Sequence, residues 1–201
     1  MRIISRQLTA LSAIAAGIVA LASTAHAQNA PYQYPVGSAN SCGAQGTTAT
    51  QLGGYSSTIP YQGQGTFQTI SNSEDDSQPA STTMMAVAFE GTGQDPELGE
   101  VTWRLVPSTT VLSTITANQV SSPLPATGRL SFYAEVRVSS QPEAIYRSEN
   151  PVVMVNRNIT EWPHRRARYN QESTVILRNI NNPAQVMMAP AMTAVVTASA
   201  Q

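Results

Sequence analysis

Apolar and polar residues alternate along much of the chain after about residue 80. The clearest run lies between Arg129 and Val138, where every second residue is apolar: Leu130, Phe132, Ala134, Val136 and Val138. Val101, Trp103 and Leu105 repeat the pattern. Successive side chains of a strand point to opposite faces, so this pattern predicts strands with one buried and one solvated face. Antiparallel sheets that are covered on one side have this pattern.

Alternation and turn residues predict several further strands, at 83–90, 109–116, 144–147, 152–156, 174–179, 185–188 and 192–197. After residue 27, no stretch of helical length carries an apolar stripe of helical period, and the many Thr, Val and Ser residues favour strands. We therefore expect an all-β fold, an antiparallel β-sandwich of about eight or nine short strands, with Greek-key connections among the arrangements open to it. A barrel would need more even strands.

The first 27 residues have the layout of a signal peptide. Arg2 and Arg6 precede an apolar run at 8–21, and Ala25-His26-Ala27 gives a small-x-small cleavage site. The run is too short to span a bilayer comfortably, so we expect cleavage after Ala27 and no transmembrane segment in the mature chain. These features predict a secreted bacterial protein of the periplasm, the cell surface or the extracellular space.

Residues 28–61 are rich in Gly, Pro, Ser, Thr and Gln and contain few apolar residues. This composition predicts a flexible or docking N-terminal arm. The remaining residues, 62–201, are enough for one core of ordinary size, so we expect a single β-sandwich domain there.

The charge of the chain excludes a general affinity for nucleic acid. All eleven basic residues are arginine, against twelve acids. Removal of the signal peptide takes two arginines, so the formal net charge of the mature chain is 9 − 12 = −3. A mildly acidic protein without a reading motif is not expected to bind nucleic acid.

Cys42 is the only cysteine, so no disulfide can form within one chain. Its neighbours are small and polar, and we expect an exposed thiol. The sequence therefore predicts an intermolecular disulfide through Cys42 as one route to self-association.

Few residues are suited to catalysis or to metal binding. His164 is the only histidine after residue 27, and no Gly-x-Ser-x-Gly turn accompanies it. Zinc has too few ligands, no pair of carboxylates stands out as a glycosidase pair, and the acidic stretches at 74–76 and 95–97 lack a calcium-loop spacing. Adjacent methionines on a strand point to opposite faces and make a poor copper site. We expect no enzyme, no catalytic residue, no metal and no cofactor.

The stretch EWPHRRARYN, residues 161–170, is the strongest candidate for a binding site. Arginine beside aromatic rings holds carboxylates, sulfates and phosphates and stacks on rings. A well-packed surface loop is the plainer interpretation. The candidate ligand-binding residues are Trp162, His164, Arg165, Arg166, Arg168 and Tyr169.

These observations leave three hypotheses. The first is an exported, non-enzymatic structural or adhesion protein of the cell surface or extracellular matrix, which associates with itself or with another surface protein through strand addition by its arm. The second is a binding module for an anionic polysaccharide or lipid that uses the loop from Trp162 to Tyr169. The third is a carboxylate-dependent enzyme that acts on polysaccharide.

Overall fold

The computed structural model describes residues 30–198 apart from residues 74, 107–109 and 164. The predicted signal peptide, 1–27, lies outside the described residues. Within them the chain is all-β, and no helix is long and apolar enough to cross a membrane. Its twelve strands are β1 (Ala39–Leu52), β2 (Tyr55–Asn72), β3 (Ser81–Asp95), β4 (Gly99–Leu105), β5 (Leu112–Gln119), β6 (Ser122–Phe132), β7 (Ala134–Val138), β8 (Tyr146–Ser148), β9 (Val152–Ile159), β10 (Ala167–Gln171), β11 (Val175–Asn179) and β12 (Val186–Ala198).

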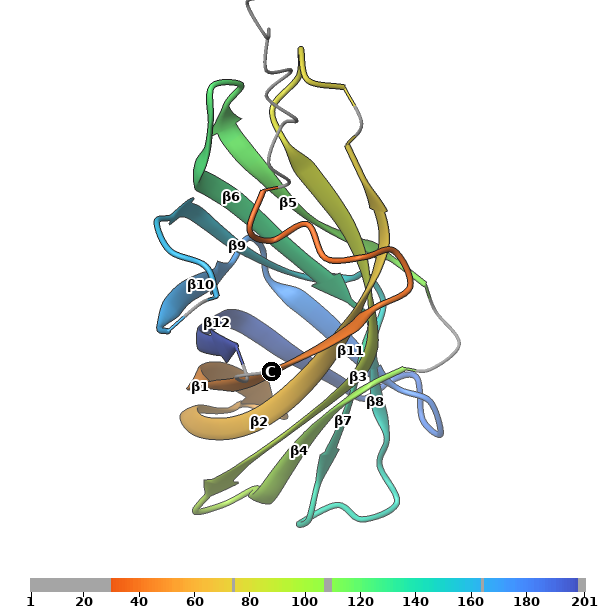
Figure 1. The fold of residues 1–201 in the computed structure, drawn as a ribbon. Coiled ribbons are helices and arrows are strands. Elements are labelled where there is room, and N and C mark those ends of the chain that lie inside the picture. The colour runs from red at the N-terminus through yellow and green to blue at the C-terminus, as the bar shows by residue number, and fades with distance from the viewer. Residues whose placement is uncertain (1–29, 74, 107–109, 164, 199–201) are drawn as a thin grey trace, which may run out of the picture.

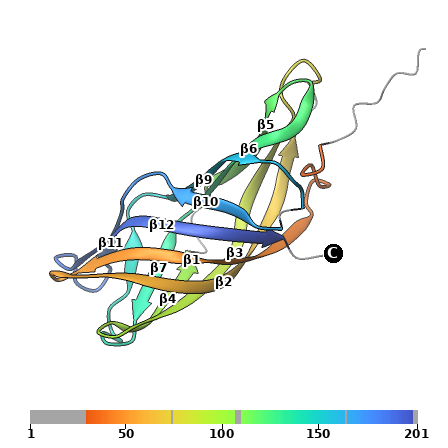
Figure 2. The same ribbon diagram turned by 90° about the vertical axis from the view of Figure 1, so that its left-hand side faces the viewer.

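The strands form one antiparallel sheet that closes on itself (Figures 1 and 2). The long strand β1 pairs with β2 on one side and with β12 on the other. One ring of pairings runs β1-β2-β3-β4-β7-β8-β11-β12 and returns to β1, and a second runs β1-β2-β3-β5-β6-β9-β10-β12. The fold is therefore a closed barrel in which four long strands are shared and four pairs of short strands divide the remaining wall.

The two rings lie at different heights because β3 and β12 each pair with two successive strands. β3 pairs with β5 through its first residues, Ser81 to Met85, and with β4 through its last, Glu90 to Asp95. Figure 1 shows β5, β6 and β9 above β4, β7 and β8. Residues 133, 149–151 and 172–174 are the short breaks between consecutive strands of the two rings.

The structure confirms the all-β, antiparallel character, but it does not confirm a sandwich. A sandwich and a closed sheet both bury every second side chain, so alternation alone does not distinguish them. The pairing of β1 with β12 identifies a closed sheet, because it joins the first described strand to the last one. The structure also has more strands than expected. The sequence analysis did not predict β1, β2 and β10, which lack a strong apolar pattern, and it did not predict the break at residue 133 that separates β6 from β7.

The expected arm of residues 28–61 is instead largely part of the sheet. Ala39 to Leu52 form β1, and Tyr55 begins β2, which pairs with β1 along the whole length of β1. The inward positions of β1 carry small residues such as Ala44, Gly46 and Thr48. These residues give no apolar alternation in the sequence, and the interior beside them is filled by larger side chains from other strands.

Several predicted strands are confirmed, with one change at the C-terminal end. The run 130–138 forms β6 and β7 with its apolar residues inward, as expected. Residues 185–188 and 192–197 are not separate strands, because β12 continues through Pro190. A bulge in the β1–β12 ladder between Ala49 and Gln51 accommodates this proline, whose nitrogen has no hydrogen to donate.

Candidate ligand cavity

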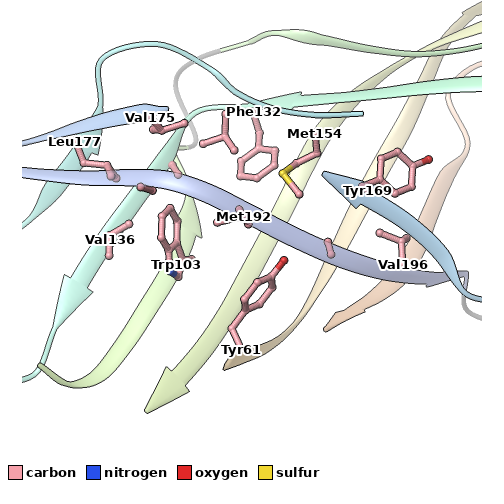
Figure 3. Packing of buried hydrophobic residues seen from close by; sticks show 14 of the residues in the cluster. Tyr61, Trp103, Phe132, Val136, Met154, Tyr169, Val175, Leu177, Met192 and Val196 are labelled. Carbon is pink, nitrogen blue, oxygen red and sulfur yellow. The ribbon is translucent and has the colours of Figure 1, made fainter. Parts of the chain in front are cut away.

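The interior of the barrel is lined mainly by apolar side chains from many strands. Figure 3 shows Phe132, Met154 and Tyr169 directed into this interior from β6, β9 and β10, with Tyr61 and Met192 from β2 and β12. Most of these side chains are at most 6% exposed. This core does not fill the centre of the barrel completely.

Two neighbouring cavities remain in the interior. The outer cavity has a volume of about 50 Å³ and is lined by Tyr34, Met84, Ile115 and Trp162, among others. The inner cavity, of about 40 Å³, lies deeper, against Tyr61, Phe132, Met154 and Met192. Both are lined by Cys42, Phe67, Leu130, Tyr169 and Val196. These five shared side chains form the partition between the two cavities.

The outer cavity reaches the surface at the end of the barrel where the segment before β1 and the last residue of β12 lie. Its lining includes exposed Ser41 and the half-buried residues Tyr34, Trp162 and Ala198. Each cavity exceeds the roughly 10–15 Å³ that one water needs, but is far smaller than the roughly 300–1,000 Å³ of a typical drug-sized pocket. The space therefore fits a narrow apolar group, and anything wider has to displace the partition.

An aromatic cluster covers this end of the barrel. The Trp162 Nε1–H donates to the Tyr34 hydroxyl at 3.1 Å, and the Tyr32 ring meets Trp162 edge-on, with centroids 6.0 Å apart. Tyr32 is fully buried, and its hydroxyl donates to the Ala80 carbonyl at 3.0 Å. These contacts of Tyr32 and Tyr34 hold the segment before β1 against the end of the barrel, and they hold Trp162 at the mouth of the outer cavity.

Cys42 lies inside the barrel wall, which differs from the exposed thiol that we expected. The side chain is half-buried between β2 and β12 and lines both cavities. Burial raises its pKa to about 11, against an opposing backbone hydrogen bond from Gly65. Burial also raises the pKa of the nearby Tyr169 phenol. The alternation of β1 turns Cys42 inward, an arrangement that does not favour the predicted intermolecular disulfide.

The predicted loop site is divided between the mouth and the interior. Trp162 lies at the mouth, and Arg165, Arg166 and Arg168 are exposed, whereas Tyr169 is 1% exposed and faces the core. His164 lies outside the described residues. Residues 167–171 form β10, since they pair with β12 and β9. The structure thus places Trp162 in the lining of the outer cavity, makes Tyr169 part of its wall, and leaves Arg168 on the outer face of β10.

Several surface carboxylates form ion pairs with arginine or accept hydrogen bonds from turn residues. Glu90, Glu135, Glu149 and Glu172 form ion pairs with arginine. Burial opposes ionisation of Asp95, but hydrogen bonds, including those from the backbone of the β3–β4 turn, outweigh it and lower its pKa. Within the described residues, no group of three His, Cys, Asp or Glu side chains is placed to hold a metal ion.

The sequence analysis missed most of the cavity residues. Phe67, Met84, Ile115, Leu130 and Val196 were each read as strand or core positions, or not considered. Their inward direction follows from alternation, but a strand pattern does not reveal that the side chains facing one another leave space between them.

Comparison with known proteins supports the fold alone. No family model matches the chain, and no curated protein matches its sequence. Among solved structures, the chain is similar to DynF from the dynemicin biosynthesis pathway of Micromonospora chersina, with a TM-score of 0.73 and 15% sequence identity over 88% of each chain. At this identity the likeness shows that the two chains share an overall architecture.

Proposed function

We propose that this protein is an exported, non-enzymatic binding protein that holds a slender apolar or amphiphilic small molecule inside its barrel. The observation that carries the proposal is the apolar interior space, divided into two cavities and reaching the surface between Tyr34 and Trp162. Closed barrels commonly hold one small ligand inside, and concave apolar sites with few polar groups are typical of small-molecule binding.

The lining supports a single flexible chain rather than a bulky ring system. Phe67 and Leu130 contribute to the partition between the cavities, and both are only half-buried. A narrow chain that displaces this partition replaces the empty space with dispersion contacts, each small but numerous. Each buried methylene contributes about 0.8 kcal/mol.

The hypothesis of assembly through strand addition remains untested, but it loses its main motive. That motive was an arm free to pair with a neighbouring subunit, and residues 39–61 already pair within this chain. The barrel interior instead favours the lipid form of the second hypothesis, with the loop from Trp162 to Tyr169 at its mouth.

The test is binding of cis-parinaric acid, a fluorescent single-chain lipid, to the purified protein, followed by competition with hexadecanol. Saturable fluorescence that hexadecanol displaces is the expected result. In Ala44→Phe, a ring enters the inner cavity, and binding weakens at least tenfold. Gln45→Phe is the matched control, because Gln45 is the exposed neighbour on β1 and faces outward.

Circular dichroism and thermal unfolding check that both variants fold. If Ala44→Phe does not fold, protection of Cys42 from alkylation by hexadecanol supplies the second measurement, since this thiol lines both cavities. No saturable binding together with no protection of Cys42 would refute the proposal.

A further inference from the structure

We propose that the rim of the outer cavity selects amphiphiles with an anionic head group, which Arg165 and Arg166 bind while the single chain enters the barrel. This inference rests on the proposed function and names the ligand class of the same site. It makes the arginines a specificity determinant and the apolar cavities the source of affinity.

The pairing of β10 with β12 places the two arginines at the rim. Ala167 pairs with Val196, which lines both cavities. Next to it, the Thr197 hydroxyl donates to the Arg165 carbonyl at 2.9 Å. Arg165 and Arg166 therefore lie one step beyond the cavity wall, in the loop whose Trp162 lines the mouth. A head group that remains outside the mouth is within reach of both side chains.

The arginines of this loop are set apart by their lack of acidic partners. Six arginines elsewhere in the described chain form ion pairs with carboxylates, namely Arg104, Arg129, Arg137, Arg147, Arg157 and Arg178. No described carboxylate forms an ion pair with Arg165, Arg166 or Arg168. Glu161, the acid of the same loop, is exposed and makes no ion pair with a described residue.

The lining of the outer cavity carries no acidic side chain among the described residues. An anion that approaches this mouth thus meets two guanidinium groups that form no ion pair with a described residue, and no carboxylate among the described residues of the wall. Guanidinium groups match carboxylates and sulfates through paired hydrogen bonds. The wall of the cavity is apolar, so the charged head is retained at the rim and the chain at depth. The molecule is bound in one orientation.

The small size of the two cavities favours a single-chain ligand. The cavities have volumes of about 50 and 40 Å³ and lie one behind the other. Two acyl chains side by side require the wall itself to separate, which the β1–β12 ladder opposes. The ligand class is therefore a long-chain carboxylate or an alkyl sulfate rather than an intact two-chain phospholipid.

The experiment compares three ligands with the same sixteen-carbon chain: hexadecanoate, hexadecyl sulfate and hexadecanol. Each displaces cis-parinaric acid from the full chain at pH 8, with the two anions kept below their micelle-forming concentrations and the alcohol below its solubility limit. We expect the two anions to bind about fivefold to twentyfold more tightly than the alcohol, because charge-assisted bonds at an exposed rim are of moderate strength. Raising the salt concentration reduces this preference.

The variants separate the rim site from general electrostatics. Arg165→Gln with Arg166→Gln removes most of the preference for anions and leaves hexadecanol binding unchanged. Arg168→Gln is the matched control: it removes the same charge from the same segment, but Arg168 is exposed on the outer face of β10, between inward-facing Ala167 and Tyr169. It leaves at least half of the preference in place.

The outcomes distinguish the two proposals. Equal affinity for the three ligands, or an anion preference that the double variant retains, overturns the head-group inference while the proposed function stands. No binding of any of the three overturns both. Sedimentation with anionic phospholipid vesicles that depends on Arg165 and Arg166, without displacement by hexadecanoate, also overturns the inference, since it places the anion in a lipid surface rather than at the cavity.

Discussion

Replacement of Gly46 by alanine tests whether the β1–β12 ladder closes the barrel and maintains the cavities. Gly46 faces inward on β1 and lies opposite Ala194 on β12. A Cβ added there would be 2.7 Å from the Thr193 carbonyl carbon and would overlap the carbonyl oxygen, whereas real Cβ atoms do not come within 3.0 Å of such neighbours. The obstacle is backbone, so no side chain can turn away to relieve it.

The size of the effect follows from what has to move. To admit the methyl group, β12 must shift away from β1, which weakens about one or two ladder hydrogen bonds of about 1 kcal/mol each and adds packing strain of about 1–3 kcal/mol. The Tyr61 hydroxyl, which donates to the Thr193 carbonyl at 3.1 Å, is displaced as well. We expect a loss of about 2–5 kcal/mol in the free energy of unfolding, or about 4–20 °C in Tm for a chain of this length.

Gly43→Ala is the matched control, since Gly43 lies on the same strand and also pairs with β12, but on the outward face. There the nearest atom to an added Cβ is the Thr197 carbonyl oxygen at 4.0 Å, an ordinary contact. We expect a change within about 1 kcal/mol of zero. Urea denaturation followed by circular dichroism measures both variants. Equal stability of Gly46→Ala and Gly43→Ala would refute the closed ladder, and a selective loss supports it.

Three further predictions concern the interior and one turn. Phe67→Ala joins the two cavities, so affinity for hexadecanoate rises severalfold in the parinaric acid competition while the free energy of unfolding falls by about 1–3 kcal/mol, a half-buried ring contributing less than a fully buried one; unchanged affinity would argue against the partition. With a pKa of about 11, Cys42 is about one-thousandth thiolate at pH 8, so iodoacetamide reacts about a hundredfold more slowly than with an unperturbed thiol of pKa 9.0, and faster as the pH rises toward 11; rapid labelling of the folded protein would contradict this. The folded pKa of Asp95 is lowered, so its contribution to stability is present above the unfolded pKa near 4 and is lost as the pH falls through the folded value; thermal unfolding between pH 7 and pH 2 is expected to show a weaker pH dependence for Asp95→Asn than for wild type, and parallel curves would refute the role of this carboxylate.

The alternation at 130–138 and 101–105 was sufficient to predict the antiparallel strands and their inward faces. This succeeded because a strand repeats every two residues, so one buried face is visible in the sequence itself. The same argument failed at β1, whose inward residues such as Ala44, Gly46 and Thr48 are small or polar. Small residues suffice at these inward positions because large side chains such as Tyr61 and Tyr169 fill the space in front of them. The sequence does not show which residues face one another.

The candidate site, too, was visible in the sequence only in part. Composition alone marked the arginine and tryptophan loop, since a concentration of cations beside aromatic rings is visible in any sequence. Tertiary structure decided that Trp162 meets Tyr34, that Cys42 faces the interior, and that the loop lies at the mouth of an apolar cavity. Strand identity is a local property of alternating residues, whereas closure of the sheet depends on pairing between Ala39–Leu52 and Val186–Ala198, more than a hundred residues apart. Only that pairing encloses a space in which a ligand can bind.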